Sequence, residues 1–259
     1  MAQSEREVVV EVRDVTTRFG DRVVHRGISL EVYRGEILAV VGGSGCGKST
    51  LLREIVMLQQ PTSGSIRVFG SEVTRQVQSK ALDMRRRMGV LFQYGALFGG
   101  LTVLENVGAP IREHTNLSHD LIDEIAAMKI GLTGLDPGAG ALYPSQLSGG
   151  MRKRAALSRA MALDPELLFL DEPSSGLDPI SADALDELVL HLKASLGLTV
   201  VMVTHDMDSL WRAADRVILL GEGRILGMGT MEQLANSDDP GVQQFFQGPR
   251  ARAARLQHV

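Results

Sequence analysis

Cysteine and long apolar runs are both scarce in this chain of 259 residues. The single cysteine, Cys46, excludes an internal disulfide framework and is consistent with a reducing compartment. The longest apolar runs have about five residues, whereas a helix needs roughly 20 to span a bilayer. The first residues, MAQSEREVVV, include acidic side chains and lack the apolar core of a signal peptide. We therefore expect a soluble, cytoplasmic protein, which another chain would have to hold if it works at a membrane.

A strong basic charge is also missing. The formal net charge is −4 and the isoelectric point is near 5.9, whereas dedicated nucleic-acid binders are usually basic overall. We therefore expect no nucleic-acid partner. Apolar residues make up 44% of the chain, which is enough for a sizeable core in one large domain or two small ones.

The run GGSGCGKST fits the phosphate-binding pattern G-x-x-x-x-G-K-[ST]. An apolar stretch at 37–41 predicts a buried strand before it, and residues 49–56 predict a helix after it. Glycines let backbone N–H groups surround phosphate oxygens, and the helix start adds unpaired N–H groups. Lys48 supplies a charge for the β- and γ-phosphates, and the Ser49 hydroxyl is a hard ligand for Mg²⁺. The residues of the predicted phosphate loop are Gly42, Gly43, Ser44, Gly45, Cys46, Gly47, Lys48, Ser49 and Thr50.

Elsewhere the chain alternates between strand and helix patterns, which predicts a parallel sheet with right-handed crossovers. Two segments rich in β-branched residues predict an antiparallel β-lobe at 8–12 and 23–32. A turn is expected at 61–64, and further strands are expected at 65–70, 88–92, 167–171, 200–204 and 217–220. Helices are expected at 75–87, 118–130, 149–162, 179–196 and 207–214.

The strand predicted at 167–171 ends in two acids, Asp171 and Glu172. Burying a carboxylate is costly unless something pairs with it, and ligands of open α/β sheets bind at the carboxyl ends of strands. Asp171 fits a partner of Mg²⁺, and Glu172 fits a group that orients and polarises an attacking water. The alternative is an acidic loop after an ordinary strand, which the phosphate loop earlier in the chain disfavours.

The motif Leu147-Ser-Gly-Gly-Met151 resembles the signature of ATP-binding-cassette (ABC) ATPases. Other elements of that family are matched in order across residues 8–233. Phe19 resembles the aromatic residue that stacks on adenine, and Gln93 resembles the Q-loop glutamine. Ser175-Gly-Leu-Asp178 resembles the D-loop, and His205 resembles the switch histidine.

The resemblance implies an α/β ABC ATPase fold, in which a RecA-like parallel-sheet core carries an antiparallel β-lobe and a helical insert. The expected ABC domain is residues 1–248, with the β-lobe and core at 1–92 and 161–235 and the insert at 93–160. Residues 249–259 are expected to form a basic C-terminal tail.

The resemblance also implies a head-to-tail homodimer that holds ATP and Mg²⁺. Each ATP would lie between the phosphate loop of one subunit and Ser148, Gly149 and Gly150 of the other. The implied catalytic residues are Lys48, Gln93, Glu172 and His205, and the implied metal ligands are Ser49, Gln93 and Asp171.

Several of these residues have a plainer interpretation. A lone Phe19 is more often core than a cofactor platform, and a lone histidine such as His205 is more often structural. Phe19 lies directly before Gly20, and His205 lies at the end of a predicted strand. These positions favour a functional role for both residues. The basic residues at 85–87 and 152–154 predict solvated helix faces, although the second group could meet lipid headgroups.

Residues 91–98, 101–107, 111–115 and 238–245, together with the LSGGM form of the signature, resemble the ATPases of MCE-type (Mla-like) lipid transporters. That resemblance implies phospholipid transport across the bacterial envelope from the cytoplasmic face of the inner membrane. It also implies a permease and an MCE lipid-binding protein as partners. The permease would dock at residues 94–101, from Tyr94 to Leu101, where Ala96, Leu97 and Phe98 would form its pocket or simply belong to the core.

Three other functions stay open. The chain could serve an ABC importer or exporter of another substrate. A soluble ABC protein that acts on nucleic acid or ribosomes is disfavoured by the charge and by the single cassette without a heptad run. A regulatory cassette without hydrolysis is disfavoured because Lys48, Asp171, Glu172 and His205 are all present.

Overall fold

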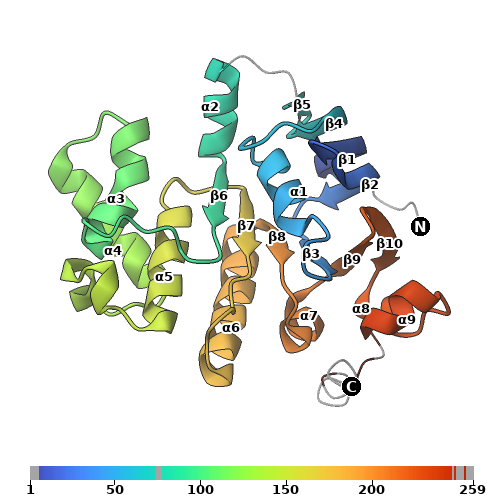
Figure 1. Ribbon diagram of the computed structural model, residues 1–259. Coiled ribbons are helices and arrows are strands. Elements are labelled where there is room, and N and C mark those ends of the chain that lie inside the picture. The colour runs from blue at the N-terminus through green and yellow to red at the C-terminus, as the bar shows by residue number, and fades with distance from the viewer. Residues whose placement is uncertain (1–5, 74–77, 247, 249–253, 255–259) are drawn as a thin grey trace. The chain divides into compact units, whose positions relative to one another are not determined.

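The computed structural model describes residues 6–73, 78–246, 248 and 254. Two compact units divide the chain: unit 1 comprises residues up to 84 and from 199 onward, and unit 2 comprises residues 85–198 (Figure 1). The expected basic tail at 249–259 lies outside the described residues apart from Ala254, and so do residues 75–77 of the helix predicted at 75–87. The rest of that helix is α2 (Gln78–Arg86).

The predicted β-lobe is confirmed in unit 1 as an antiparallel sheet of order β2-β1-β4-β5. Its strands are β1 (Val8–Phe19), β2 (Arg22–Tyr33), β4 (Ser63–Val68) and β5 (Ser71–Glu72). Residues Gly20 and Asp21 alone connect β1 to β2, so the hairpin is tight. The turn predicted at 61–64 is partly wrong, because Ser63 already pairs with Thr16 of β1.

The other strands of unit 1 are neighbours in the order β10-β9-β3-β8. Its strands are β3 (Ile37–Gly42), β8 (Thr199–Val203), β9 (Arg216–Gly221) and β10 (Arg224–Gly229). Strand β3 is parallel to both β8 and β9, as predicted, and every residue of β3 and β8 is buried. The prediction omitted β10, which runs antiparallel to β9. Its RILGMG sequence has two glycines and only half-buried or exposed positions, so it lacks an apolar strand pattern.

Helix α1 (Lys48–Ile55) directly follows the loop after β3. Its apolar side chains line a small cavity together with side chains of β2, β3 and β8. Helix α1 therefore packs between strand β2 and strands β3 and β8. The lining includes Leu30, Val32, Leu38, Val40, Leu51, Leu52, Ile55, Val201 and Val203. Helices α7 (Met207–Ala213), α8 (Met231–Ala235) and α9 (Pro240–Phe246) also belong to unit 1, and the sequence predicted only α7 among these three.

In unit 2, β6 (Met88–Leu91) pairs in parallel with β7 (Leu167–Asp171), as predicted. Helix α6 (Pro179–Leu196) has the predicted bounds. Asp178 caps its start, and Gly197, with a φ of 66°, ends it. Both signals are visible in the sequence, which explains the agreement.

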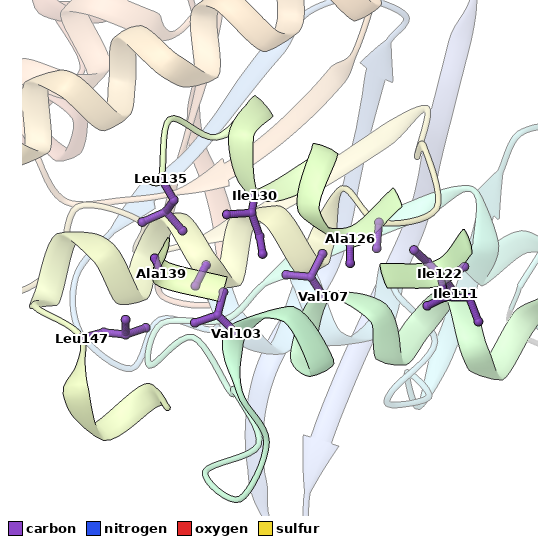
Figure 2. Packing of buried hydrophobic residues seen from close by; sticks show 11 residues of the cluster. Val103, Val107, Ile111, Ile122, Ala126, Ile130, Leu135, Ala139 and Leu147 are labelled. Carbon is purple, nitrogen blue, oxygen red and sulfur yellow. The ribbon is translucent and has the colours of Figure 1, made fainter. Parts of the chain in front are cut away.

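The helical part of unit 2 has a core of its own, to which α3 and α4 contribute most of the side chains (Figure 2). Its elements are α3 (Val103–His114), α4 (His119–Leu132), the 3-10 turns η1 (Pro137–Ala141) and η2 (Pro144–Gln146), and α5 (Gly149–Ala160). The core residues include Val103, Val107, Ile111, Ile122, Ala126, Ile130, Leu135, Ala139 and Leu147. The sequence prediction missed α3, which contains Pro110. The capping box formed by Thr102 and Glu105 was the signal that marks its start.

Candidate nucleotide site

The loop between β3 and α1 closes tightly on itself and on β9. Gly42 has a φ of 147°, and a Cβ atom there would lie 2.2 Å from the carbonyl oxygen of Leu220. The same Cβ would lie 2.8 Å from Sγ of Cys46. Only glycine fits such a position, so the first glycine of the motif is required by the approach of β9 as well as by its own backbone conformation.

A hollow of about 360 Å³ opens beside the loop. It is lined by Phe19, Arg22, Val24, Gly45, Gly47, Lys48, Ser49 and Thr50. Phe19 ends β1 and is 51% exposed, so the plainer interpretation of a core phenylalanine is wrong. Arg22 was not predicted to contribute; it donates a 3.4 Å hydrogen bond to the carbonyl oxygen of Gly45.

The ammonium group of Lys48 lies over the loop. Its Nζ donates to the carbonyl oxygens of Gly42 and Gly43 at 2.9 and 3.0 Å, and Sγ of Cys46 is 3.9 Å away. Helix α1 begins at Lys48, so its first N–H groups have no partner within the helix. A cation, the N–H groups of a helix start and an adjoining hollow form a site suited to an anionic ligand such as a polyphosphate.

His205 follows β8, the neighbour of β3 in the same parallel sheet. Val203 at the end of β8 pairs with Val40, two residues before Gly42, so His205 and the loop leave the sheet at the same edge. The imidazole is exposed. Asp206 caps α7 by accepting hydrogen bonds from the backbone N–H groups of Asp208 and Ser209, which fixes the turn that carries His205.

Beneath the loop lies a buried polar group that the sequence analysis did not identify. His25 of β2 places Nε2 3.1 Å from the carbonyl oxygen of Gly47. On the other side of the ring, Nδ1 lies 3.3 Å from Oε2 of Glu54 and 3.1 Å from Oγ1 of Thr17. The side chains of His25 and Glu54 are fully buried.

In unit 2, the two predicted acids lie at the carboxyl end of β7. Asp171 is the last residue of the strand and is buried, with 7% exposure. Glu172 has a φ of 50°, in the left-handed region that non-glycine residues rarely adopt. Such conformations cost of order 1–3 kcal/mol and cluster at functional sites.

Lys153 of α5 holds the segments that carry two predicted catalytic residues. Its Nζ donates to the carbonyl oxygen of Gln93 at 2.6 Å and to that of Glu172 at 2.9 Å. Burial lowers the pKa of Lys153 below its ordinary value of 10.5, and the carboxylates of Glu172 and Asp171 offset part of that shift. Gln93 and Glu172 follow the paired strands β6 and β7, so Lys153 spans two neighbouring strand ends.

The prediction of a solvated basic face at 152–154 is therefore wrong for Lys153, although Arg152 is exposed as expected. Lys153 is only 7% exposed. Arg152 donates to the carbonyl oxygen of Pro144, and Arg154 donates to that of Thr133. All three cations point to carbonyl oxygens within unit 2, because α5 packs among its other elements, including α3, α4 and β6.

The signature motif begins α5, as predicted. Ser148 is the N-cap residue and accepts a hydrogen bond from the N–H of Met151 at 3.2 Å. Ser148 and Gly149 are exposed and Gly150 is partly exposed, so this helix start is open to a ligand. The predicted D-loop ends at Asp178, the N-cap of α6, which accepts from the N–H and the hydroxyl of Ser181.

The two interpretations of residues 96–98 each hold in part. Leu97 packs against the core of the helical region. Ala96 is exposed, and Phe98 and the nearby Tyr94 are 58% and 84% exposed. An apolar surface therefore remains beside Gln93.

Asn106 of α3, which the sequence analysis also missed, makes hydrogen bonds to the loop at residues 98–102. Its Oδ1 accepts from the N–H of Phe98 at 2.7 Å. Its Nδ2 lies within hydrogen-bond distance of the carbonyl oxygens of Phe98, Leu101 and Thr102, at 3.1, 3.0 and 2.9 Å. The side chain is fully buried.

Within residues 6–73 and 78–246, no group of three or more His, Cys, Asp or Glu side chains is placed to hold a metal ion. None of the helices in the described part of the chain has the length and apolar character needed to cross a bilayer.

Comparison with known proteins agrees with these motifs. Residues 25–175 match the family described as ABC transporter. The intermembrane phospholipid transport system ATP-binding protein MlaF of Haemophilus influenzae is 42% identical over 250 residues, covering 96% of this chain and 94% of that protein. MlaF of Escherichia coli K12 is also 42% identical, covering 93% and 89%. The probable ribonucleotide transport ATP-binding protein mkl of Mycobacterium leprae is 37% identical, covering 94% and 70%.

Solved structures agree as well. The dimeric post-hydrolysis structure of the ATP-binding cassette MJ0796, bound to ADP and Pi, has a TM-score of 0.79 and 29% identity, covering 85% of this chain and 98% of that chain. The structure of cbiO1 from Clostridium perfringens, part of the ABC transporter complex cbiONQ, has a TM-score of 0.80 and 26% identity, covering 98% and 100%. The predicted fold is thereby confirmed, and the chain belongs to the ABC transporter family.

Proposed function

We propose that this chain is the ATP-hydrolysing subunit of an ABC transporter that moves phospholipid across a bacterial envelope. The hollow beside the phosphate loop supports the binding of ATP, because it combines an exposed aromatic ring, Phe19, with the ammonium of Lys48. The ring offers a surface on which adenine can stack, and the loop offers N–H groups and a charge for the phosphates.

The donor set fits a magnesium ion that is bound together with phosphates. Mg²⁺ keeps several waters and takes one or two protein oxygens besides those of the nucleotide. The Ser49 hydroxyl, the Gln93 side-chain oxygen and the Asp171 carboxylate are the proposed ligands. When bound, the ion would neutralise charge that develops on the phosphoryl oxygens.

Hydrolysis requires a group that orients water, and Glu172 is the proposed base. Its left-handed backbone and the hydrogen bond from Lys153 to its carbonyl oxygen support a fixed carboxylate direction. His205 is proposed to contact the γ-phosphate, and Lys48 to stabilise the charge of the transition state.

The exposed start of α5 is proposed to complete the ATP site of a second copy in a head-to-tail dimer. Ser148, Gly149 and Gly150 would direct N–H groups and the positive end of the helix dipole at the γ-phosphate. The dimeric state of the MJ0796 cassette supports this arrangement.

A phospholipid substrate is supported by the 42% identity to MlaF proteins over nearly the whole chain. We propose that a permease docks at residues 94–101, where Tyr94 and Phe98 are exposed. A permease would hold the chain at the cytoplasmic face of the inner membrane, and an MCE lipid-binding protein would complete the complex. The likeness to mkl favours ribonucleotides as a second candidate substrate class.

Lys48→Ala tests the ATPase proposal. Removing a preorganised cation from the transition state should lower ATP turnover by at least about 10²-fold. Arg53→Ala, in the last turn of the same helix, is the matched control and should retain turnover. Unchanged turnover in Lys48→Ala would contradict the role of the loop.

The substrate is tested on the complex isolated from its native membrane. Mass spectrometry of the detergent-purified complex should detect bound phospholipid and an MCE protein. A complex that contains a nucleotide-binding or sugar-binding receptor and no MCE protein would reject lipid transport and leave the ATPase proposal intact.

A further inference from the structure

The buried group beneath the phosphate loop links three elements of unit 1. His25 of β2 contacts the Gly47 carbonyl through Nε2, and it contacts Glu54 of α1 and Thr17 of β1 through Nδ1. A Cβ atom on Gly47 would lie 2.5 Å from Nε2. The second glycine of the motif is therefore needed for the histidine to reach the loop at all.

Hydrogen-bond accounting places a proton on the ring nitrogen that faces the loop. A carbonyl oxygen only accepts, so Nε2 must carry a proton. Thr17 lies 2.6 Å from Oε1 of Glu54 and donates its hydroxyl proton there. Nδ1 then faces the Thr17 hydroxyl oxygen and Oε2 of Glu54, and one proton between Nδ1 and Oε2 satisfies both atoms.

We propose that His25 positions the phosphate loop for nucleotide binding. The Gly47 oxygen also accepts from the N–H of Leu51 at 2.9 Å, so His25 occupies its second lone pair. In a trans peptide the N–H of Lys48 points opposite to that oxygen. Holding the Gly47 carbonyl therefore fixes the direction of a loop N–H on the side away from His25.

The inference rests on the proposed binding of ATP, and the double variant His25→Phe/Glu54→Leu tests it. Replacing both partners of a buried polar pair by apolar residues of similar volume is often neutral for stability, so the full-length chain should keep its thermal midpoint. The loop would lose one buried hydrogen bond, which should weaken binding of magnesium-ATP about tenfold. The KM for ATP should rise with the dissociation constant, whereas kcat should change much less.

The matched control is Glu36→Leu/Arg216→Met, which removes an ion pair of 2.9 Å at the opposite end of β3. It should leave the dissociation constant of ATP unchanged. If the wild-type chain itself failed to bind magnesium-ATP, the proposed function would fall. If the wild type bound ATP and the His25 double variant bound it equally well, only the role of His25 would be refuted.

A spectroscopic measurement checks the hydrogen bond to the loop directly. In a chain labelled with nitrogen-15 histidine, the signal that disappears in the double variant belongs to His25. Its Nε2 should carry a proton, because the Gly47 carbonyl oxygen can only accept. An unprotonated Nε2 would overturn the role of His25 even if the dissociation constant of ATP changed.

Discussion

Lys153 donates a hydrogen bond of 2.9 Å to the main-chain oxygen of Glu172, which directly follows β7 and has a left-handed backbone conformation. The same ammonium holds the carbonyl oxygen of Gln93 at 2.6 Å, so one buried cation joins the two loops that carry the proposed base and the Q-loop glutamine. Both of these hydrogen bonds are to main-chain oxygens, so the effect of Lys153 on hydrolysis would pass through the positions of these loops.

Lys153→Met should therefore lower kcat for ATP by about tenfold or more, because a misplaced catalytic group loses rate steeply with distance. The KM for ATP should stay within about threefold, since the substitution leaves the phosphate loop intact. Two carbonyl oxygens lose their donor, at a cost of about 1–3 kcal/mol each if they stay buried. Relief from burying a charge offsets part of that cost. Steady-state kinetics and thermal unfolding measure both effects.

Lys129→Met is the matched control for this experiment. Lys129 is the second buried lysine of unit 2, with 3% exposure, and it pairs with Asp164 rather than with a catalytic loop. Its replacement should reduce stability and leave kcat near the wild-type value. An equal loss of kcat in both variants would mean that Lys153 acts only through general stability.

Glu172→Gln should bind ATP and hydrolyse it about 10²- to 10⁴-fold more slowly, because the amide cannot accept the proton of the attacking water. The stalled variant should accumulate as a dimer with ATP, which size-exclusion chromatography with light scattering detects. Glu187→Gln, an exposed position on α6, should behave like the wild type. Turnover near the wild-type rate in Glu172→Gln would remove Glu172 from the role of base.

The sequence was sufficient to predict the elements whose local signals and packing agree. The phosphate loop is one case: glycines, an apolar strand before it and a helix after it all specify one backbone, and the structure has that backbone. Helix α6 is another case, because Asp178 and Gly197 mark its two ends. Helix α3 was missed because Pro110 usually ends a helix, although the core residues Val107 and Ile111 continue on the buried side.

His25 could not be located by strand alternation. Ile28, Leu30 and Val32 are buried, and continuing their alternation places His25 on the opposite face. The pairing of β1 with β2 shifts between Val15↔Ile28 and Thr17↔His25, where two residues of β1 are matched by three of β2. An irregularity of this kind reverses which side chains face the core. Only the pairing register reveals it.

Lys153 was missed for a different reason. It lies between two arginines, and a run of three cations is usually a solvated surface. The periodicity of the helix contained the contrary signal, because Lys153 shares a face with the buried Ala156 and Ala160. Whether that face is covered depends on strands and helices far away in the sequence.

Ser181→Ala should raise the pKa of Asp178, because the Ser181 hydroxyl is the main group that lowers it. A lowered pKa means that the capping carboxylate stabilises the fold above its unfolded-state pKa, and that this contribution disappears as the pH falls through the folded-state value. The stability difference between wild type and Ser181→Ala should therefore be constant at neutral pH and shrink in acid. Carbon-13 titration of the Asp178 carboxyl and thermal melts measure the two quantities. A difference that grows as the pH falls would contradict this linkage.

Asn106→Ala should separate ATP hydrolysis from transport. Asn106 makes hydrogen bonds to Phe98, Leu101 and Thr102, so its loss frees the loop that presents Tyr94 and Phe98 to the proposed permease. Buried backbone groups left without partners should lower stability by about 1–3 kcal/mol. ATP turnover of the purified chain should stay within about threefold, because the phosphate loop is untouched, whereas lipid transport by the assembled complex should fall much further. Asn116→Ala, at an exposed position after α3, controls for loss of an asparagine, and equal transport by the two variants would remove residues 94–101 from the docking surface.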